Sequence, residues 1–308
     1  MELTNIETIL NDALIHSSKY IDDGNVATYI PELAKADKNL LGASIVTIEG
    51  KRYHVGDWHQ EFTIQSISKT ISLIFALHNL GPEIVFNKVG MEPSGDPFNS
   101  IIKLETKKYP SNPYINAGAI AVAGLISERY SFEDYLKLVR LFCGRNSIEV
   151  DENVYMSESK TGMLNRSLAY MMNSSGVLEA DVEKTLDFYF KMCSVKVNSN
   201  DLANYAAILA NDGLDLKSGD RLIDNSILKI VKSLMLTCGM YDGSGEFAIR
   251  VGMPAKSGVG GGILAFAENK LGICVFGPAL DSQGNSIGGY HMLEYLSKEL
   301  GLHYFSGK

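Results

Sequence analysis

Hydrophobic residues follow two different spacings along the chain, and each spacing predicts a kind of element. Residues 5 to 21 place their apolar side chains on one face of an amphipathic helix. The segment LLGASIVTIEGKRYHVGD then contains two runs rich in β-forming residues, joined at Glu49-Gly50-Lys51. Because glycine between two such runs favours a tight turn, this segment predicts an antiparallel β-hairpin.

From Ser66 to about residue 235, most apolar residues return at intervals of three and four. This spacing is typical of amphipathic helices, and two of the segments that show it end in glycine, which often follows the last turn of a helix. The segments are INAGAIAVAGLISERY, FEDYLKLVRLF, LNRSLAYMMNSSG and SNDLANYAAILANDG. The middle of the chain is therefore predicted to be helical.

The C-terminal part of the chain returns to the pattern of strands. It predicts three strands, with a turn at Glu268-Asn269-Lys270 and a closing helix at HMLEYLSKEL. The predicted strands are GEFAIRVGM, GGILAFAEN and LGICVFGPAL. Hairpin connections make neighbouring strands antiparallel, so the order of strands, helices and strands indicates an α+β fold.

The predicted architecture is an antiparallel sheet flanked by helices, with an inserted all-helical domain. Residues 1–64 and 236–308 would form a discontinuous sheet domain, and residues 65–235 would form the helical domain. A cleft between two such units is a natural place for a small-molecule site, so we expect the active site there.

Composition and charge narrow the classes of function. The 308 residues are 45% hydrophobic and 21% charged, which is the balance of a globular protein. A formal net charge of −8 without a run of basic residues predicts no binding to nucleic acid or to a membrane surface. The N-terminus lacks the pattern of a signal peptide, and no apolar stretch reaches the roughly 18 residues of a membrane span. We therefore expect a cytoplasmic protein.

The cysteines and histidines show no metal-binding pattern. No Cys-x-x-Cys pair occurs, and no histidine stands at ligand spacing beside a cysteine, so we expect no metal site and reduced, buried thiols. The four cysteines are Cys143, Cys193, Cys238 and Cys274.

A serine and a lysine three residues apart are the first sign of catalytic chemistry. Ser66 and Lys69 stand where the predicted hairpin meets a long apolar helix, which would bury both side chains. Residues three apart share a helix face, and burial lowers the pKa of a lysine, as a catalytic base requires. The alternative is an ordinary helix start with a solvated lysine. Spacing alone does not decide, because it occurs at Ser66/Lys69, Ser100/Lys103, Ser157/Lys160 and Ser226/Lys229.

A Lys-Ser-Gly sequence strengthens the catalytic interpretation. Enzymes with a Ser-x-x-Lys pair often carry Lys-Ser/Thr-Gly on a strand beside the nucleophile. Lys217-Ser218-Gly219 lies in a polar turn, whereas Lys256-Ser257-Gly258 leads into an apolar β run. Glycines there let a substrate approach the backbone, so the N–H of Val259 would form an oxyanion hole with that of Ser66. A bend or bulge in the strand is the alternative.

With both motifs in place, the chain resembles the serine-dependent β-lactamase and penicillin-binding superfamily, and more closely the bacterial glutaminases. The resemblance implies a β-lactamase/transpeptidase-like fold. It also implies hydrolysis of the side-chain amide of L-glutamine to L-glutamate and ammonia, without a cofactor. It runs from about Tyr29 to about His291 and rests on VATYIPELA, FTIQSISK, NPYINAGAI, SESKTGMLNRSLA, LDFYFKMCS, CGMYDGSGEFA and PAKSGVGGGI.

The resemblance also implies catalytic roles for individual residues. Ser66 would be the nucleophile that forms a γ-glutamyl ester, and Lys69 the base that takes its proton. Tyr241 would shuttle or stabilise that proton. The main-chain N–H groups of Ser66 and Val259 would hold the oxyanion.

Polar residues at other family positions would bind the two charges of a free amino acid. Glu158 suits the α-ammonium group, and the amides and phenols suit the α-carboxylate. Without the resemblance, Tyr189 would be interpreted as a core aromatic residue and Glu158 as a solvated helix residue. The substrate-binding set is Tyr29, Gln65, Asn116, Glu158, Asn165, Tyr189, Tyr241 and Val259.

The chain departs from the glutaminase pattern beside Asn165. Glutaminases usually carry arginine just before this asparagine, whereas this chain has Leu164 there and Arg166 after it, which makes the local packing an open question. We interpret Tyr114, in a Tyr-x-Asn sequence with Asn116, as incidental.

Other interpretations of the chain stay open. By resemblance to related enzymes, we expect a homodimer or a homotetramer with L-glutamine as substrate. One alternative is a penicillin-binding or β-lactamase-type acyltransferase or hydrolase. Another is a non-catalytic amino-acid sensor on the same fold.

Overall fold

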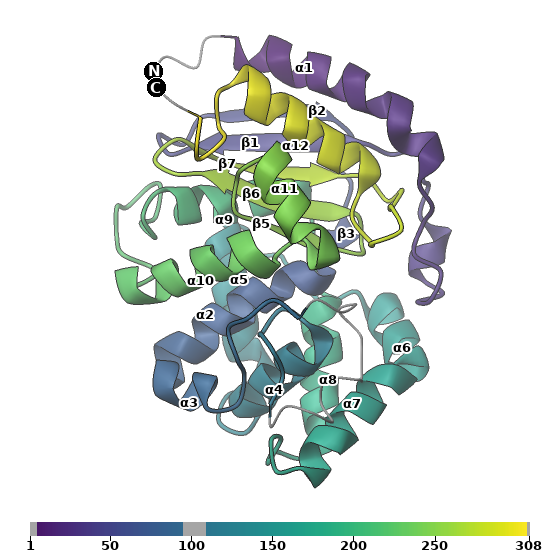
Figure 1. Cartoon of the computed structure of the whole chain (residues 1–308), viewed down its shortest axis with the longest axis vertical. Coiled ribbons are helices and arrows are strands. Elements are labelled where there is room, and N and C mark those ends of the chain that lie inside the picture. The colour runs from purple at the N-terminus through teal and green to yellow at the C-terminus, as the bar shows by residue number, and fades with distance from the viewer. Residues whose placement is uncertain (1–4, 95–108, 307–308) are drawn as a thin grey trace.

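One antiparallel sheet joins segments that are far apart in the sequence (Figure 1). The computed structural model describes residues 5–94 and 109–306. Within these residues the sheet has the strand order β2-β1-β7-β6-β5, and each neighbouring pair is antiparallel. The predicted α+β class is therefore confirmed. The strands are β1 (Gly42–Thr47), β2 (Arg52–Gly56), β5 (Ala255–Gly258), β6 (Gly262–Ala267) and β7 (Leu271–Phe276).

Both predicted turns of the sheet are present. β1 and β2 form a hairpin with Ile45 opposite Tyr53, and Gly50 turns the chain with a φ of 83°. β6 and β7 are joined at Asn269, which has a φ of 56°. Glycine and asparagine adopt this left-handed conformation more readily than other residues, which explains their presence at the two turns.

One predicted strand is wrong, because most of the segment GEFAIRVGM forms helix α11 (Ser244–Arg250). The third strand of this region is instead β5. The alternation of Phe247, Ile249 and Val251 favoured a strand with one apolar face, yet Ile249 is 79% exposed. Phe247 and Val251 are four residues apart and both buried, which is the spacing of one face of a helix.

The predicted helical block is confirmed between the two halves of the sheet. Capping boxes begin two of its helices, at Ser131 with Asp134 and at Asn198 with Asp201. Two short strands, β3 (Phe62–Thr63) and β4 (Lys196–Val197), also pair in this region. The helices of the block are α2 (Ser68–Leu80), α3 (Pro82–Phe86), α4 (Asn116–Ser127), α5 (Phe132–Cys143), α6 (Glu152–Thr161), α7 (Met163–Ser174), α8 (Val182–Cys193), α9 (Ser199–Ala210) and α10 (Asn225–Cys238).

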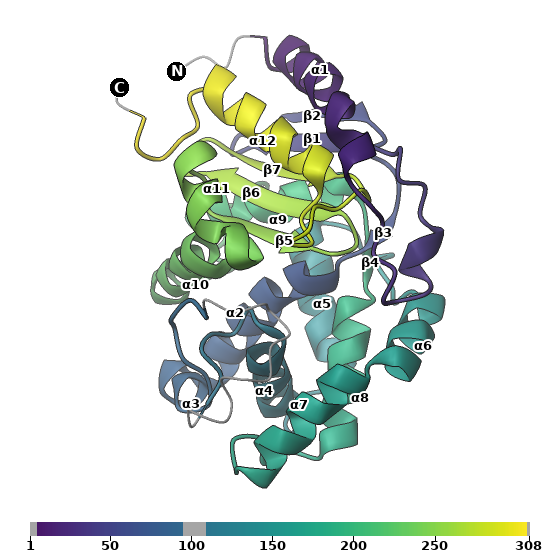
Figure 2. The same ribbon diagram turned by 45° about the vertical axis from the view of Figure 1, so that its right-hand side comes forward.

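Helices cover both faces of the sheet (Figures 1 and 2). α1 (Ile6–Ser17) and α12 (Ile287–Glu299) pack against each other on the outer face. α9 packs against β7, β1 and β6 on the other face. The predicted N-terminal and closing helices are therefore both present. In the part of the chain that the structure describes, no helix has the length and apolar character needed to cross a lipid bilayer.

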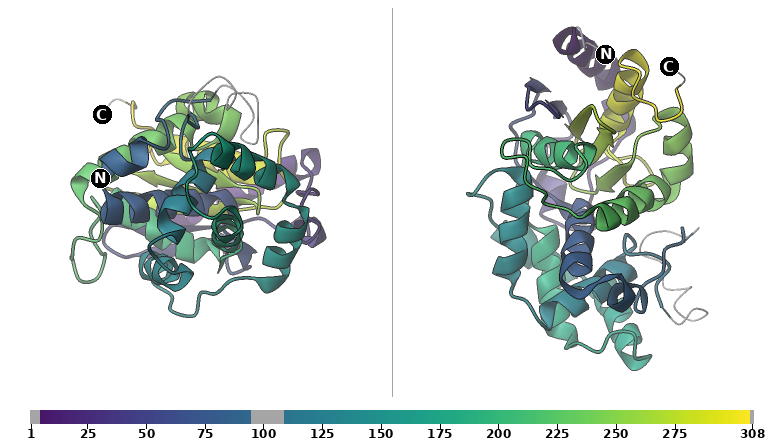
Figure 3. Two further views of the ribbon diagram at one scale, coloured as in Figure 1. Left: turned by 90° about the horizontal axis from the view of Figure 1, so that it is seen from below. Right: turned by 90° about the vertical axis from the view of Figure 1, so that its left-hand side faces the viewer.

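The sheet separates two apolar clusters of the core. Ile263 and Ile273 face α1 and α12, whereas Leu264 and Phe266 face α9 and join the side chains of the helical block. α2 lies in the middle of that block, against α10, α4 and α5 (Figure 3). The core therefore continues from the inner face of the sheet to the helix that begins beside Ser66.

β7 passes very close to α9 at Gly272. A Cβ atom at Gly272 would lie 2.1 Å from the backbone nitrogen of Ala207 and 2.4 Å from the carbonyl carbon of Ala206. Gly272→Ala should therefore lower the free energy of unfolding by about 1–3 kcal/mol, because the backbone of α9 would have to move. Urea denaturation followed by circular dichroism measures this change.

Gly245→Ala in α11 is the matched control for that experiment. A Cβ atom at Gly245 would have no atom within 4 Å, so this variant should be as stable as the wild type or slightly more stable. A Gly272→Ala protein with unchanged stability would contradict the close approach of β7 and α9.

Candidate active site

Ser66 lies at the front of α2, in a 3₁₀ turn of residues Gln65–Ile67 that runs directly into the helix. The Ser68 hydroxyl donates to the carbonyl oxygen of Gln65 at 2.6 Å, which closes this turn. Gln65 has a φ of 47°, a backbone conformation that costs energy for any residue except glycine. Such strain beside a buried serine is typical of functional sites.

Lys69 is fully buried one turn after Ser66. Its Nζ atom donates to Oδ1 of Asn116 at 2.7 Å and to the backbone carbonyl of Tyr114 at 3.1 Å. Burial lowers the pKa of Lys69 to about 8, although the nearby Glu158 carboxyl opposes this shift. Lys69 therefore loses its proton near pH 8, well below the pH at which a solvated lysine does. Its approach to the Ser66 hydroxyl stays a prediction.

The other Ser-x-x-Lys pairs do not share this environment. Lys160 and Lys229 are exposed on α6 and α10, and the pair Ser100/Lys103 lies outside the described residues. Lys217-Ser218-Gly219 forms an exposed turn, as predicted. Burial, which the spacing alone does not reveal, distinguishes Ser66 and Lys69 from the pairs on α6 and α10.

Two asparagines from different helices connect Lys69 to the rest of the site. Asn116 is the first residue of α4, and its Nδ2 donates to Oδ1 of Asn165 on α7 at 3.0 Å. Because Oδ1 of Asn116 accepts from Lys69, the hydrogen bond to Asn165 sets the orientation of the Asn116 amide. The predicted binding residues Asn116 and Asn165 thus lie next to each other.

Glu158 is buried on α6, where the sequence alone favoured a solvated residue. Nε2 of Gln65 donates to the Glu158 carboxylate at 3.5 Å and to the hydroxyl of Thr63 at 3.3 Å. Burial raises the pKa of Glu158 to about 8, and Gln65 and Lys69 oppose this shift. A cation bound nearby would therefore stabilise the ionised form of this carboxyl group.

Tyr241 lies just after α10 and is buried, with a φ of 53°. Burial raises the pKa of its phenol, whereas hydrogen bonding with the Ser66 side chain and the Val259 backbone lowers it. Tyr241 and Val259 also belong to one small apolar cluster with Ala27. Ser66, Tyr241 and Val259 therefore lie close together, and their roles as nucleophile, phenol and oxyanion N–H stay predictions.

Tyr29 and Tyr189 approach Glu158 from two different segments. Tyr189 is buried on α8, and burial together with the nearby Cys193 and Glu158 raises the pKa of its phenol. Tyr29 is 57% exposed as a whole residue, and desolvation by the protein around its phenol raises its pKa, which Tyr241 and Glu158 raise further. Tyr29 is therefore positioned at the rim of the site.

β5 brings the Lys-Ser-Gly sequence to the sheet edge next to the nucleophile. A Cβ atom at Gly258 would lie 2.8 Å from the carbonyl oxygen of Ile64, and one at Gly260 would lie 2.4 Å from that of Thr63. These glycines therefore let the strand itself approach the segment before Ser66. Their predicted role towards a substrate stays a prediction.

Sequence reasoning gave no role to Lys256 and treated Tyr114 as incidental. Lys256 is fully buried, donates to the backbone carbonyls of Ser257 and Gly239, and places its Nζ 4.5 Å from the centre of the Tyr241 ring. The Tyr114 carbonyl accepts from Lys69. The position of Lys256 in the Lys-Ser-Gly sequence was the available signal, whereas no sequence signal marks a backbone carbonyl.

The substitution beside Asn165 is accommodated at the surface. Leu164 is exposed, and Arg166 turns towards the neighbouring helices. Arg166 donates to the Ser159 carbonyl on α6 at 2.6 Å and lies 5.5 Å from the centre of the Phe190 ring on α8. Arg166 therefore connects α6, α7 and α8 around the asparagine.

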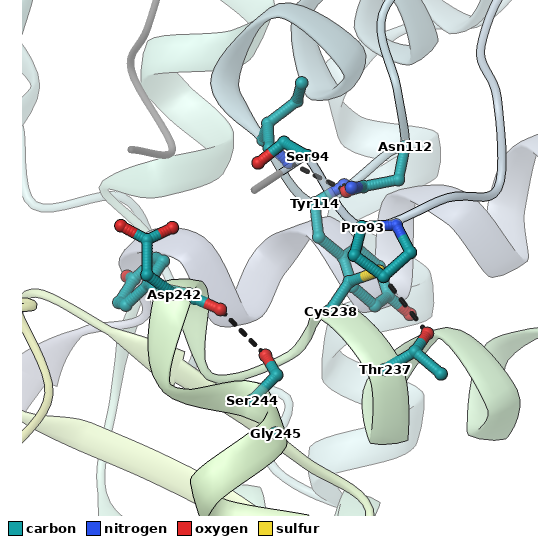
Figure 4. Close-up of a pocket in the computed structure, with 11 residues that line it drawn as sticks. Pro93, Ser94, Asn112, Tyr114, Thr237, Cys238, Asp242, Ser244 and Gly245 are labelled. Carbon is teal, nitrogen blue, oxygen red and sulfur yellow. Dashed lines mark hydrogen bonds between the residues drawn. The ribbon is translucent and has the colours of Figure 1, made fainter. Parts of the chain in front are cut away.

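A cavity of 360 Å³ opens beside Tyr241 (Figure 4). Ser244 holds the turn below it by donating to the Tyr241 carbonyl at 2.8 Å. Its polar lining includes Ser94, Asn112 and Asp242. All four cysteines are buried free thiols, as predicted, and no group of three metal-binding side chains occurs among residues 5–94 and 109–306.

An antiparallel sheet between helices, with a serine at the front of a buried helix and a buried lysine one turn later, is typical of serine-dependent enzymes with the β-lactamase-like fold. The family model described as Glutaminase matches residues 24–305. The chain belongs to the glutaminase family. It is therefore an amidohydrolase (EC 3.5.1.2) that converts L-glutamine to L-glutamate and ammonia.

Curated relatives are similar over nearly their whole length. A glutaminase of Clostridium botulinum (strain Loch Maree / Type A3) is 51% identical, with 96% of this chain and 99% of the relative covered. A glutaminase of Fusobacterium nucleatum is 50% identical over 97% of this chain and 100% of the relative.

A solved structure of a probable glutaminase from Bacillus subtilis, complexed with 6-diazo-5-oxo-L-norleucine, has a TM-score of 0.89 and 36% identity. The match covers 99% of this chain and 98% of the Bacillus subtilis chain. A covalent complex of Bacillus subtilis glutaminase with 5-oxo-L-norleucine has a TM-score of 0.88 and 36% identity. The match covers 98% of this chain and 100% of the chain in the covalent complex. The β-lactamase-like fold of these neighbours agrees with the fold described above.

The hydrogen bond from Lys69 to Asn116 leads to a testable prediction. Asn116→Asp would place a carboxylate where the amide oxygen now accepts from Lys69, and should raise the pKa of Lys69 above its present value of about 8. NMR titration of protein labelled with ¹³C-lysine, with the signal assigned by Lys69→Met, measures this shift.

Asn165→Asp is the control for charge alone. Asn165 bonds to Asn116 and not to Lys69, so its carboxylate should raise the pKa of Lys69 by less. Equal pKa values of Lys69 in the wild type and in Asn116→Asp would contradict the bonding described here.

Proposed function

We propose that Ser66 and Lys69 carry out the hydrolysis of L-glutamine as nucleophile and base. The observation that supports this most directly is the burial of Lys69 one helical turn from Ser66, with a pKa lowered to about 8. At physiological pH a lysine with this pKa has a neutral fraction on the order of a fifth, far larger than that of a solvated lysine, and the neutral form can accept a proton.

In the proposed first step, Oγ of Ser66 attacks the side-chain carbonyl carbon of glutamine, and its proton passes to Lys69. The N–H groups of Ser66 and Val259 stabilise the oxyanion that forms. The proton that Lys69 took from Ser66 passes through the hydroxyl of Tyr241, which is near Ser66, to the leaving nitrogen, so ammonia departs and Lys69 is neutral again. A γ-glutamyl ester of Ser66 remains.

In the second step, water attacks the ester carbonyl and gives up a proton to the same base. The bond to Oγ breaks, Oγ regains a proton, and glutamate leaves. One water is consumed and one ammonia is released for each glutamine. The reaction needs no electron transfer, so no redox cofactor has a role in it.

The amino-acid end of the substrate is proposed to lie against Glu158. The α-ammonium group would pair with the carboxylate of Glu158. Because burial raises the pKa of Glu158, binding of the cation would favour loss of the proton from its carboxyl group. Neutral donors would hold the α-carboxylate, which avoids placing a second charge beside Lys69. These donors are Tyr29, Gln65, Asn116, Asn165 and Tyr189.

The Bacillus subtilis covalent complex supports this arrangement. That glutaminase, which is 36% identical, reacts with 6-diazo-5-oxo-L-norleucine and retains 5-oxo-L-norleucine. The fifth carbon of norleucine corresponds to the amide carbon of glutamine, so the ligand has the same amino-acid end as glutamine. Its diazo group leaves from the sixth carbon, so the covalent bond forms one atom beyond the carbon that is attacked in glutamine. We propose that the present chain binds the amino-acid end of glutamine in the same way.

We further propose a sheet unit of residues 1–64 and 236–308, a helical unit of residues 65–235, and an active site between them. The contribution of β5 from one unit and of α2 from the other supports this division. A homodimer or homotetramer in the cytoplasm is proposed from the resemblance, and sedimentation velocity tests the oligomeric state. The net charge of −8 supports the absence of nucleic-acid binding.

Ser66→Ala should abolish release of ammonia and glutamate while binding of glutamine remains measurable. The expected loss is about 10⁴-fold or more, because the covalent step has no other nucleophile. Coupled assays for ammonia and glutamate measure turnover, and isothermal titration calorimetry measures binding.

Ser68→Ala is a matched control two residues away. The Ser68 hydroxyl closes the turn by bonding to the Gln65 carbonyl, and it is not assigned to the reaction. Near-normal turnover in Ser66→Ala would show that the nucleophile is a different residue. Binding of glutamine without turnover in the wild type would support the sensor alternative.

The pH dependence tests Glu158 and Lys69 together. Activity requires neutral Lys69 and ionised Glu158, whose pKa values are both about 8, so both groups lose an inhibitory proton as pH rises. Wild-type kcat/KM should therefore increase from pH 6 to pH 9, on the order of tenfold or more.

Glu158→Gln removes one of these two titrations and the charge that pairs with the ammonium group. The rise of kcat/KM with pH should become shallower, and its value at pH 9 should fall by about tenfold or more. An unchanged kcat/KM in this variant would remove Glu158 from the site.

A further inference from the structure

We propose that Asp281 is a positioning residue for catalysis, because it fixes a loop of residues 281–286 that holds Tyr241 and Val259 in place. No role has been given above to this loop, which follows β7 and precedes α12. The inference rests on the proposed roles of Tyr241 and Val259 in hydrolysis.

Asp281 organises the loop through several hydrogen bonds. Its Oδ1 accepts from the backbone N–H of Gln283 at 2.8 Å and from that of Asn285 at 2.9 Å. Its own N–H donates to the Asn285 carbonyl at 2.8 Å, and the N–H of Gly284 donates to the Asp281 carbonyl at 3.1 Å. A side chain that accepts from two backbone N–H groups of a short loop sets the shape of that loop.

The loop touches both parts of the proposed catalytic apparatus. Gly284 has a φ of 93°, and a Cβ atom there would lie 3.4 Å from Cγ1 of Val259 and 3.7 Å from Cε2 of Tyr241. The side chain of Gln283 lies against the turn that follows Tyr241, since a Cβ atom at Gly243 would be 2.4 Å from its Oε1. One loop therefore lies beside the phenol ring, its turn and the oxyanion residue.

Tyr241 needs support on this side because its backbone is strained. A φ of 53° is unfavourable for a tyrosine, and such a conformation persists only when the surroundings hold it. Ser244 supports the turn from within, accepting from the Met240 N–H at 3.0 Å and donating to the Tyr241 carbonyl. Lys256 lies 4.5 Å from the centre of the ring. Gly284 of the loop lies beside Cε2 of the ring.

The two ends of the loop are also fixed. Leu280 forms backbone bridges with Asn25 and with Ser286, so the two ends of the loop lie next to each other. Leu280 packs with Ala27, Tyr241 and Val259 in one small apolar cluster. Losing the Asp281 acceptor would therefore release the loop between its fixed ends, beside Tyr241, while the rest of the fold remains.

A displaced phenol should affect the chemical step more than substrate capture. The residues proposed to bind the amino-acid end of glutamine on α4, α6, α7 and α8 do not contact the loop through any bond described above. A shift of about 1 Å in a catalytic group is enough to cost on the order of a hundredfold in rate. The expected signature is therefore a fall in kcat with KM nearly unchanged.

The experiment compares Asp281→Ala, Asp281→Asn and Asp215→Ala by steady-state kinetics with L-glutamine. Asp215 is a matched control, because its Oδ1 also accepts from two backbone N–H groups, at 2.9 Å and 2.8 Å, in an exposed turn. Asp281→Ala should lower kcat by about tenfold or more with KM within about threefold. Asp281→Asn keeps an oxygen acceptor and should restore most of kcat, and Asp215→Ala should match the wild type.

Gly284→Ala gives a second test that leaves the Asp281 bonds in place and applies even if Asp281→Ala does not fold. Its methyl group would press on Val259 and Tyr241 at a φ of 93°, so kcat should again fall at nearly constant KM. Wild-type kcat in this variant, or equal losses in Asp281→Ala and Asp215→Ala, would overturn the proposal. So would a failure of Asp281→Asn to recover activity.

Tyr241→Phe separates this inference from the proposed function. If Tyr241→Phe has normal kcat, the proposed role of the phenol is wrong and the inference falls with it. If Tyr241→Phe is impaired while folded Asp281→Ala and Gly284→Ala are normal, only the positioning role of the loop is wrong.

Discussion

The site depends on burying the ammonium group of Lys69 without a carboxylate bonded to it among the described residues. A buried cation must either receive hydrogen bonds from oxygen acceptors or lose its proton. Both effects are present at Lys69. Asn116 and the Tyr114 backbone accept hydrogen bonds from its ammonium group, and burial lowers its pKa to about 8. α4 must therefore begin beside α2, and α7 must bring Asn165 to hold the Asn116 amide. The positions of α2, α4 and α7 at the site are therefore linked through the hydrogen bonds around Lys69.

A second constraint lies at the sheet edge. β5 meets the segment before Ser66 at distances that only glycine permits, so the edge of the sheet and the front of α2 form one rigid contact. The positive φ values of Gln65 and Tyr241 occur on the two sides of this contact. Backbone strain is thus concentrated where the reacting atoms would lie, and packing on either side maintains it.

The sequence predicted the parts of the fold that are governed by local pattern. The hairpin at Gly50, the turn at Asn269 and the helical block were all predicted from spacing and turn residues. The segment with Ile249 was not, because a short alternation of apolar residues fits a strand and a helix equally well until burial is known. The burial of Glu158 and the position of Lys256 against Tyr241 depend on long-range packing, and only the family resemblance drew attention to Glu158 and Tyr189.

The order of strands in the sheet has a consequence for synthesis on the ribosome. β1 is made early and pairs with β2 on one side, but its other edge must wait for β7, whose Ile273 pairs with Ile45. Until then an apolar strand with unpaired backbone groups is present on a chain whose helices are already forming. Pairing over so long a separation is slow, so β1 lacks one of its two neighbours until the C-terminal strands have been made. Because β5 is also made late, the enzyme gains its active site only as its last strands emerge.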